Sequence, residues 1–69
     1  MIDDKEVIAK RLKQYRKQSG LTQAALGKKA GVDKNTIARL ERGTHPASLL
    51  TIKKLAEAFD VTVSDILGR

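Results

Sequence analysis

Side chains that can hydrogen-bond to nucleic-acid bases are concentrated in one short stretch near the middle of the chain. Lys34, Asn35 and Arg39 all lie in this stretch. Lys and Arg donate hydrogen bonds to guanine O6 and N7, and Asn pairs with N6 and N7 of adenine. Ala38 offers a methyl group that suits the methyl of thymine. The chemistry open to these residue types is the reading of base edges in a duplex groove.

Other residue types limit the alternatives. The chain contains a single histidine, His45, and no cysteine, which excludes disulfides, thiolate zinc sites and cysteine nucleophiles. Catalysis needs a positioned acid, base or nucleophile, and no such set can be assembled. We therefore expect no enzyme, no metal, no cofactor and no small-molecule ligand. His45 itself fits an exposed loop residue.

The positive charge lies in one half of the chain. Residues 10–45 hold ten basic and two acidic side chains, a net +8, whereas residues 46–69 hold three of each. Such a distribution is typical of a polyanion binder, although a solvated lysine-rich surface explains the charge alone equally well. With only two aromatic residues, the chain lacks the stacking platforms that single-strand and membrane-surface binders use. Double-stranded DNA is the favoured partner.

A chain of 69 residues allows one domain, 1–69, and its patterning is helical throughout. In three places an apolar residue precedes a capping residue, and a second apolar residue follows five positions after the first, as in a hydrophobic staple. The first helix is expected after Asp3, with Glu6 reaching back to the cap, and Gly20 is its expected stop. The spacing predicts an all-α fold of five helices, at 4–19, 23–30, 34–42, 49–59 and 63–67.

The second and third helices form the expected functional unit. Gly31 can adopt the left-handed conformation of a tight turn, and Gly27 provides a small residue where the two helices cross. Two short helices joined in this way form a helix-turn-helix, whose second helix lies in the major groove of DNA. Because Ile37 and Leu40 mark the buried side of this helix, its outward, base-reading residues are expected to be Lys34, Asn35, Ala38 and Arg39. Asn35 could instead serve only to start the helix.

The run L-T-Q-A-A-L-G-K-K-A-G-V-D-K-N-T-I-A-R-L-E-R-G resembles the helix-turn-helix of the lambda-repressor-like (XRE, or Cro/repressor) family. Residues 8–67 follow the five-helix plan of that family, ending in V-T-V-S-D-I-L. The resemblance implies a cytoplasmic regulator, encoded by a bacterium or phage, that represses transcription as a two-fold dimer on a palindromic operator. The alternative it leaves open is an antitoxin-like protein-interaction module on the same fold.

The resemblance also implies roles for individual residues. Gln23 opens the second helix at a position that binds a DNA phosphate and braces the recognition helix. Arg16 and Glu41 resemble a buried structural ion pair between the first and third helices. The remaining phosphate contacts are expected from Thr36, which could instead be a local capping group, and from the residues after the third helix: Arg42, Thr44 and His45.

Two further expectations concern a dimer contact and two departures from the family pattern. Its neutral charge allows two copies to meet without repulsion, so we expect a homodimer through the region of Ile66 and Leu67. Asp60 stands where the family often has glycine, and Gly27 where it often has alanine. Gly27 costs about 1 kcal/mol of helix propensity, and Asp tolerates the left-handed conformation less well than Gly. Both departures bear on stability rather than on DNA binding.

Overall fold

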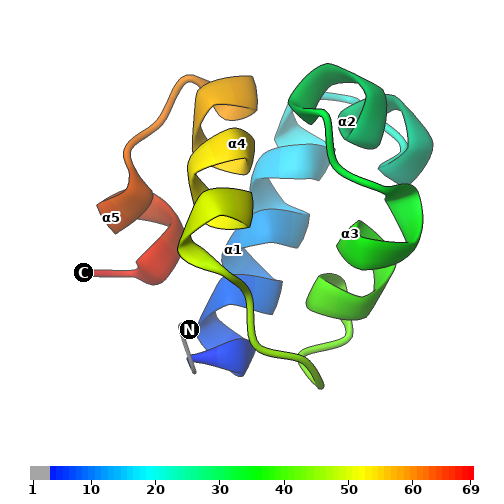
Figure 1. Ribbon diagram of the computed structural model, residues 1–69. Helices are drawn as coiled ribbons and strands as arrows, with labels where there is room; N and C mark the ends of the chain where they lie inside the picture. The colour runs from blue at the N-terminus through cyan, green and yellow to red at the C-terminus, as the bar shows by residue number, and fades with distance from the viewer. Residues whose placement is uncertain (1–3) are drawn as a thin grey trace.

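The computed structural model describes residues 4–69 and is built from helices, as predicted (Figure 1). The five helices are α1 (Lys5–Gln18), α2 (Gln23–Ala30), α3 (Lys34–Glu41), α4 (Leu49–Phe59) and α5 (Val63–Leu67). The bounds of α2, α4 and α5 coincide with the prediction. The predicted α1 is one residue too long at each end, and α3 ends at Glu41 because Arg42 takes the C-cap position.

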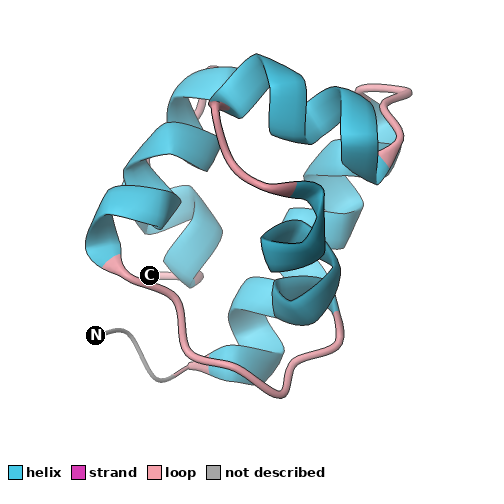
Figure 2. Cartoon of the chain, turned by 45° about the vertical axis from the view of Figure 1, so that its right-hand side comes forward, coloured by secondary structure: helices cyan, strands magenta, loops and turns pink. Residues whose placement is uncertain are grey.

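Helix α1 is the central element of the fold. It packs against α3, α4 and α5, while α2 packs against α3 and α4. Figure 2 shows the short turn that joins α2 to α3 and the longer loop that leads from α3 to α4. This arrangement leaves one side of α3 free of neighbouring helices, on the right of Figure 1.

The core is formed by one apolar face from every helix. Its fully buried larger side chains are Ile8, Leu12, Leu26, Ile37, Ile52, Leu55 and Ile66. The rings of Tyr15 and Phe59 pack on this core with their centroids 5.6 Å apart. The burial of Ile66 corrects the prediction that it forms part of a dimer surface, because its side chain fills the space beneath α5. Leu67 beside it is half-buried.

Two apolar residues near the ends of their helices are exposed. Leu49 is 47% exposed and Val7 is 40% exposed. Leu49 is the first residue of α4 and lies three positions before the buried Ile52. Val7 lies at the rim of the fold, close to Gly68. Apolar periodicity identifies the inward face of a helix but does not fix how deeply each residue at the edge of that face is buried.

The predicted staples fix where three helices begin. The side chains of Thr22 and Asp33 cap α2 and α3 by accepting hydrogen bonds from the backbone amides of Ala25 and Asn35. Thr62 and Asp65 form a capping box at the start of α5. Hydrogen bonds from the backbone amide and then the hydroxyl of Thr62 lower the pKa of Asp65. The side chains just before these caps pack against the core, as a staple requires.

The start of α1 differs from the prediction. The expected cap, Asp3, lies outside the described residues. Asp4 occupies the N-cap position, and its side chain makes no capping hydrogen bond. At the other end, Gly20 has a φ of +69°, and its amide and that of Leu21 bond back to the carbonyls of Lys17 and Arg16. Gly20 therefore ends α1 as predicted.

The turn between α2 and α3 depends on Gly27 and Gly31. Gly31 has a φ of +71°, and a side-chain carbon placed at Gly27 would lie 2.5 Å from the carbonyl oxygen of Val32. Gly27 lowers the helix propensity of α2, but it also leaves room for the carbonyl oxygen of Val32, which a larger residue would not. The backbone of the turn approaches α2 closely, which brings the start of α3 against it.

Replacing Asp60 by glycine is expected to stabilise the domain by about 1 kcal/mol. Asp60 ends α4 with a φ of +57° and is the one non-glycine residue with positive φ among residues 4–69. Its carboxylate also lies at a helix C-terminus, where negative charge is unfavourable. Urea unfolding of the wild type, Asp60→Gly and Asp60→Asn tests both causes, because asparagine removes the charge and eases the strain in part, while glycine removes both. A midpoint unchanged in both variants would contradict the argument.

Candidate nucleic-acid interface

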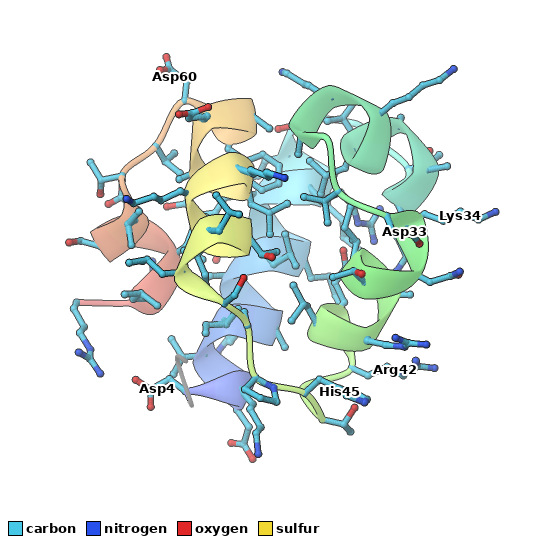
Figure 3. All side chains as sticks on the ribbon, viewed as in Figure 1. Asp4, Asp33, Lys34, Arg42, His45 and Asp60 are labelled. Atoms are coloured by element: carbon cyan, nitrogen blue, oxygen red, sulfur yellow. The ribbon has the colours of Figure 1, made fainter. Side chains whose placement is uncertain are left out.

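One face of α3 presents polar side chains to solvent while the other face is buried. Ile37 and Leu40 are 0% and 3% exposed and attach the helix to the core. The predicted base-reading residues lie on the other side, where Lys34, Asn35 and Arg39 are exposed and Ala38 is half-buried. In Figure 3, Lys34 and Arg42 extend away from the body of the protein on this side. The structure thus brings the predicted readers together on the free side of α3.

The first turn of α3 is held by its cap. The carboxylate of Asp33 accepts a hydrogen bond from the backbone amide of Asn35 at 2.7 Å. This bond involves the main chain of Asn35, so its side-chain amide stays available for another partner. Because Asp33 caps the helix, the capping role considered for Thr36 belongs to Asp33. Thr36 is half-buried in the same turn.

Arg16 and Glu41 form the ion pair that the family resemblance implies. The guanidinium of Arg16 donates from Nε to Glu41 Oε2 at 2.6 Å and from Nη2 to Oε1 at 3.0 Å. A third donor, Nη1, bonds to the carbonyl oxygen of Leu21 at 2.8 Å. The hydrogen bond to Glu41 raises the pKa of Arg16. This bidentate pair fastens the end of α3 to α1 and to the entry of α2.

Gln23 joins the same network. Its side-chain amide donates a hydrogen bond to Glu41 Oε1 at 3.3 Å. Gln23 therefore contacts α3 at its C-terminal end, while its own backbone amide lies in the first turn of α2. The unpaired backbone amides of a helix N-terminus attract anions. The structure places a half-buried amide side chain beside such an N-terminus and against the C-terminal end of α3.

The predicted loop residues continue from the end of α3. Arg42, Thr44 and His45 are all exposed. The hydroxyl of Thr44 and Nδ1 of His45 are 2.8 Å apart, which pairs the two side chains. In Figure 3, Arg42 and His45 lie along the lower edge of the molecule, one after the other. Cationic and polar groups thus continue beyond α3 in the direction of the loop.

In the part of the chain that the structure describes, no three histidine, cysteine or acidic side chains are grouped to hold a metal ion. Nor does any helix between residues 4 and 69 have the length and hydropathy needed to cross a membrane.

Sequence reasoning missed two features of this region. The resemblance implied that Gln23 braces the recognition helix, but it did not identify Glu41 as the partner, because the two residues are distant in the sequence and only the crossing of α2 and α3 joins them. Sequence reasoning also missed an open groove of about 630 Å³ between α1 and the end of α3, lined in part by Lys10, Lys13 and Lys17. The helical spacing of these three lysines places them on one face of α1 and could have indicated it.

Comparison with known proteins agrees with this geometry. An uncharacterized HTH-type transcriptional regulator of Methanocaldococcus jannaschii is 43% identical over 56 residues, which cover 81% of this chain and 85% of that protein. The immunity repressor protein of Bacillus phage phi105 is 36% identical over 61 residues, covering 88% of this chain and 42% of the repressor.

A solved structure shares the fold over nearly its whole length. The restriction-modification controller protein C.AhdI from Aeromonas hydrophila superposes with a TM-score of 0.85 at 33% identity, covering 91% of this chain and 96% of that one. The model of the helix-turn-helix family HTH_3 matches residues 12–66. That span includes all of α2, α3 and α4 together with the Arg16–Glu41 pair. The chain therefore belongs to the HTH_3 family of helix-turn-helix proteins.

Proposed function

We propose that this protein binds a specific sequence of double-stranded DNA and represses transcription by occupying an operator. The observation that carries the proposal is the outward face of α3, where Lys34, Asn35 and Arg39 are exposed together while Ile37 and Leu40 hold the helix to the core. Inserted in the major groove, these side chains suit guanine and adenine edges. The methyl group of Ala38 suits a thymine. The name of the phage repressor supports the repressing role.

Phosphate contacts on either side of the groove would orient α3. On one side, Gln23 donates to a phosphate together with the backbone amides at the start of α2. On the other side, phosphates of the adjacent DNA strand would be contacted by the loop residues Arg42, Thr44 and His45. Thr36 would add a further phosphate contact from α3. Because Gln23 also bonds to Glu41, the phosphate contact and the recognition helix are held in a fixed relation.

Removing the Gln23 side chain is expected to weaken binding to every duplex by about tenfold. A hydrogen bond to a charged group contributes about 1.5 kcal/mol or more, and a phosphate contact carries no sequence information. The measurement compares the Kd of the wild type and Gln23→Ala for a specific duplex and a scrambled one. Equal loss on both is expected, and a loss confined to the specific duplex would make Gln23 a base reader instead.

We propose that two copies bind a palindromic operator, with contacts through the C-terminal half of the chain. Residues 46–69 carry no net charge, so two copies can approach there without repulsion. Since Ile66 is in the core, the contact surface would use exposed apolar side chains of that half. Leu49 and Leu50 are the most exposed of these, at 47% and 63%.

Half-site spacing tests the dimer. Two-fold helix-turn-helix dimers hold their recognition helices about one DNA turn, roughly 34 Å, apart. Inserting about five base pairs between the half-sites rotates one of them by half a turn to the opposite face of the duplex. The insertion should abolish cooperative binding, whereas inserting a full turn should preserve more of it. Equal affinity for all three spacings would mean that single copies bind independently.

The alternative, a module that binds protein alone, has less support. A member of this fold that binds only protein does not need cationic and amide side chains on the outward face of α3. Lys34, Asn35 and Arg39 are all present and exposed there. Antitoxin-like proteins of this fold often bind DNA as well, so that role would add a partner to the proposal and leave the DNA interface unchanged.

A further inference from the structure

A basic groove lies on the flank of α3, outside the set of residues that would read DNA. It is an open hollow of about 630 Å³ between one face of α1 and the end of α3. Four exposed cationic side chains line it: Lys10, Lys13, Lys17 and Arg42. Ala9 and Gly43 lie between them, and Glu6 stands at the rim. The three lysines lie about 10 Å apart from first to last, following the helical rise of 1.5 Å per residue.

The charge of the groove is strongly positive. Glu41 also lines it, but its carboxylate is neutralised by the bidentate contact with Arg16. The uncompensated groups are then four cations against the single carboxylate of Glu6. Several like charges on one face repel one another, so a polyanion that enters the groove relieves this repulsion in addition to its direct attraction.

A chain of contacts connects this groove to the DNA interface. Arg16 lies between Lys13 and Lys17 in sequence and binds Glu41, and Glu41 in turn accepts a hydrogen bond from Gln23. Arg42 belongs to both surfaces, since it lines the groove and begins the loop that would follow the DNA backbone. The groove thus adjoins the DNA interface at Arg42.

We infer that this groove, defined by Lys10, Lys13, Lys17 and Arg42, binds the phosphates of DNA that flanks the operator half-site. The inference rests on the proposed function and extends it, because it adds a sequence-independent contact beyond the base pairs that α3 reads. Once α3 is in the major groove, the neighbouring phosphates are held close to α1. The additional contact is then intramolecular and loses no further translational or rotational entropy of association. Each phosphate contact made by a lysine releases condensed counterions.

The composition of the groove favours DNA over an acidic segment of a partner protein. Protein interfaces depend on buried aromatic anchors, and no aromatic side chain lines this groove. Between the lysines the groove offers only Ala9 and Gly43 as small apolar contacts. Flexible ammonium groups on one helix face suit a regular row of phosphates, for which position along the strand is not critical.

Two triple variants test the inference. The groove variant carries Lys10→Gln, Lys13→Gln and Lys17→Gln. The control carries Lys29→Gln, Lys53→Gln and Lys54→Gln, which removes the same charge from exposed positions that do not line the groove. Lysine and glutamine have similar helix propensities, so both proteins should fold, which circular dichroism verifies. Each protein is titrated against a duplex limited to the operator and against one extended by about ten base pairs at each end.

The wild type is expected to bind the extended duplex more tightly than the short one. A slope of about 0.9 per phosphate corresponds to roughly a fivefold gain for each contact at about 0.15 M salt. The groove variant should lose this advantage, and its salt slope on the extended duplex should fall by about 2 to 3. Its base preference should not change. The control should keep the advantage of the extended duplex.

A gain-of-function variant tests the same inference in the opposite direction. Glu6 is exposed at the rim of the groove, where its charge would repel a phosphate. Glu6→Gln should therefore raise affinity for the extended duplex by a few-fold and leave affinity for the short duplex nearly unchanged.

Several results would overturn the inference. These are an equal affinity of the wild type for the two duplexes, an equal loss in the groove and control variants, or an undiminished advantage in the groove variant. If DNA binding by the groove variant is normal, an acidic peptide becomes the favoured occupant. The proposed function fails separately, and with it this inference, if the wild type binds all sequences with equal affinity.

Discussion

Replacing Arg16 by methionine is expected to lower the free energy of unfolding by about 3 kcal/mol or more. The variant leaves the carboxylate of Glu41, in a residue that is 6% exposed, without its bidentate partner. Removing one member of a buried pair typically costs about 3 to 5 kcal/mol because the remaining charge is uncompensated. The carbonyl of Leu21 loses its donor as well. The free energy of unfolding of a domain of this size is about 3 to 10 kcal/mol, so the expected loss is a large part of the total.

A double variant shows whether the effect comes from the unpaired charge. Arg16→Met combined with Glu41→Met removes both charges and fills the site with apolar groups, and it should recover most of the lost stability. Urea unfolding of the wild type, both single variants and the double variant completes the cycle. A double variant whose loss equals the sum of the two single losses would contradict a coupled pair. If Arg16→Met were as stable as the wild type, the pair would contribute nothing measurable.

Replacing Arg39 by alanine is expected to weaken binding to the operator by about 1 to 3 kcal/mol and to relax preference at one base pair. Arg39 is exposed on the outward face of α3, and its guanidinium can bond to two acceptors of one guanine. Discrimination against a wrong base therefore depends on that single side chain. Affinity for a scrambled duplex should fall less, because on that duplex the variant loses only the attraction of one positive charge.

The measurement for Arg39 is a set of titrations on operator variants that differ at one base pair each. The wild type should reject the changed base pair at a single position, and Arg39→Ala should accept it. Lys53→Ala provides a matched control, since it removes one exposed cation from α4 and should leave every preference intact. If Arg39→Ala weakened all sequences equally, Arg39 would be a phosphate contact and the reader assignment would be wrong.

Most of the fold could be predicted because its signals are local. A staple joins residues five apart and a cap joins residues within one turn, so Thr22, Asp33 and Thr62 could be recognised without knowledge of the rest of the chain. The starts of α2, α3 and α5 are confirmed for this reason. Gly20 could be recognised as the end of α1 on the same local grounds, since a helix end of this kind needs a positive φ.

The features that could not be predicted depend on how the helices are placed in three dimensions. The burial of Ile66 is set by the packing of α5 against its neighbours. The hydrogen bond from Gln23 to Glu41 requires α2 and α3 to cross at a particular angle. The roles of Lys34, Asn35 and Arg39 toward DNA remain predictions, since their geometry fits the role and a bound duplex is needed to test it.

Selection of bound sequences from a random duplex pool at about 0.15 M salt shows whether α3 reads a DNA sequence. We expect enrichment of a palindrome whose half-sites lie about one turn apart, with preferred bases that Lys34, Asn35 and Arg39 can contact. Recovery of no motif, with binding that disappears as the salt concentration rises, would contradict it. The basic half of the chain would then attract DNA through charge alone.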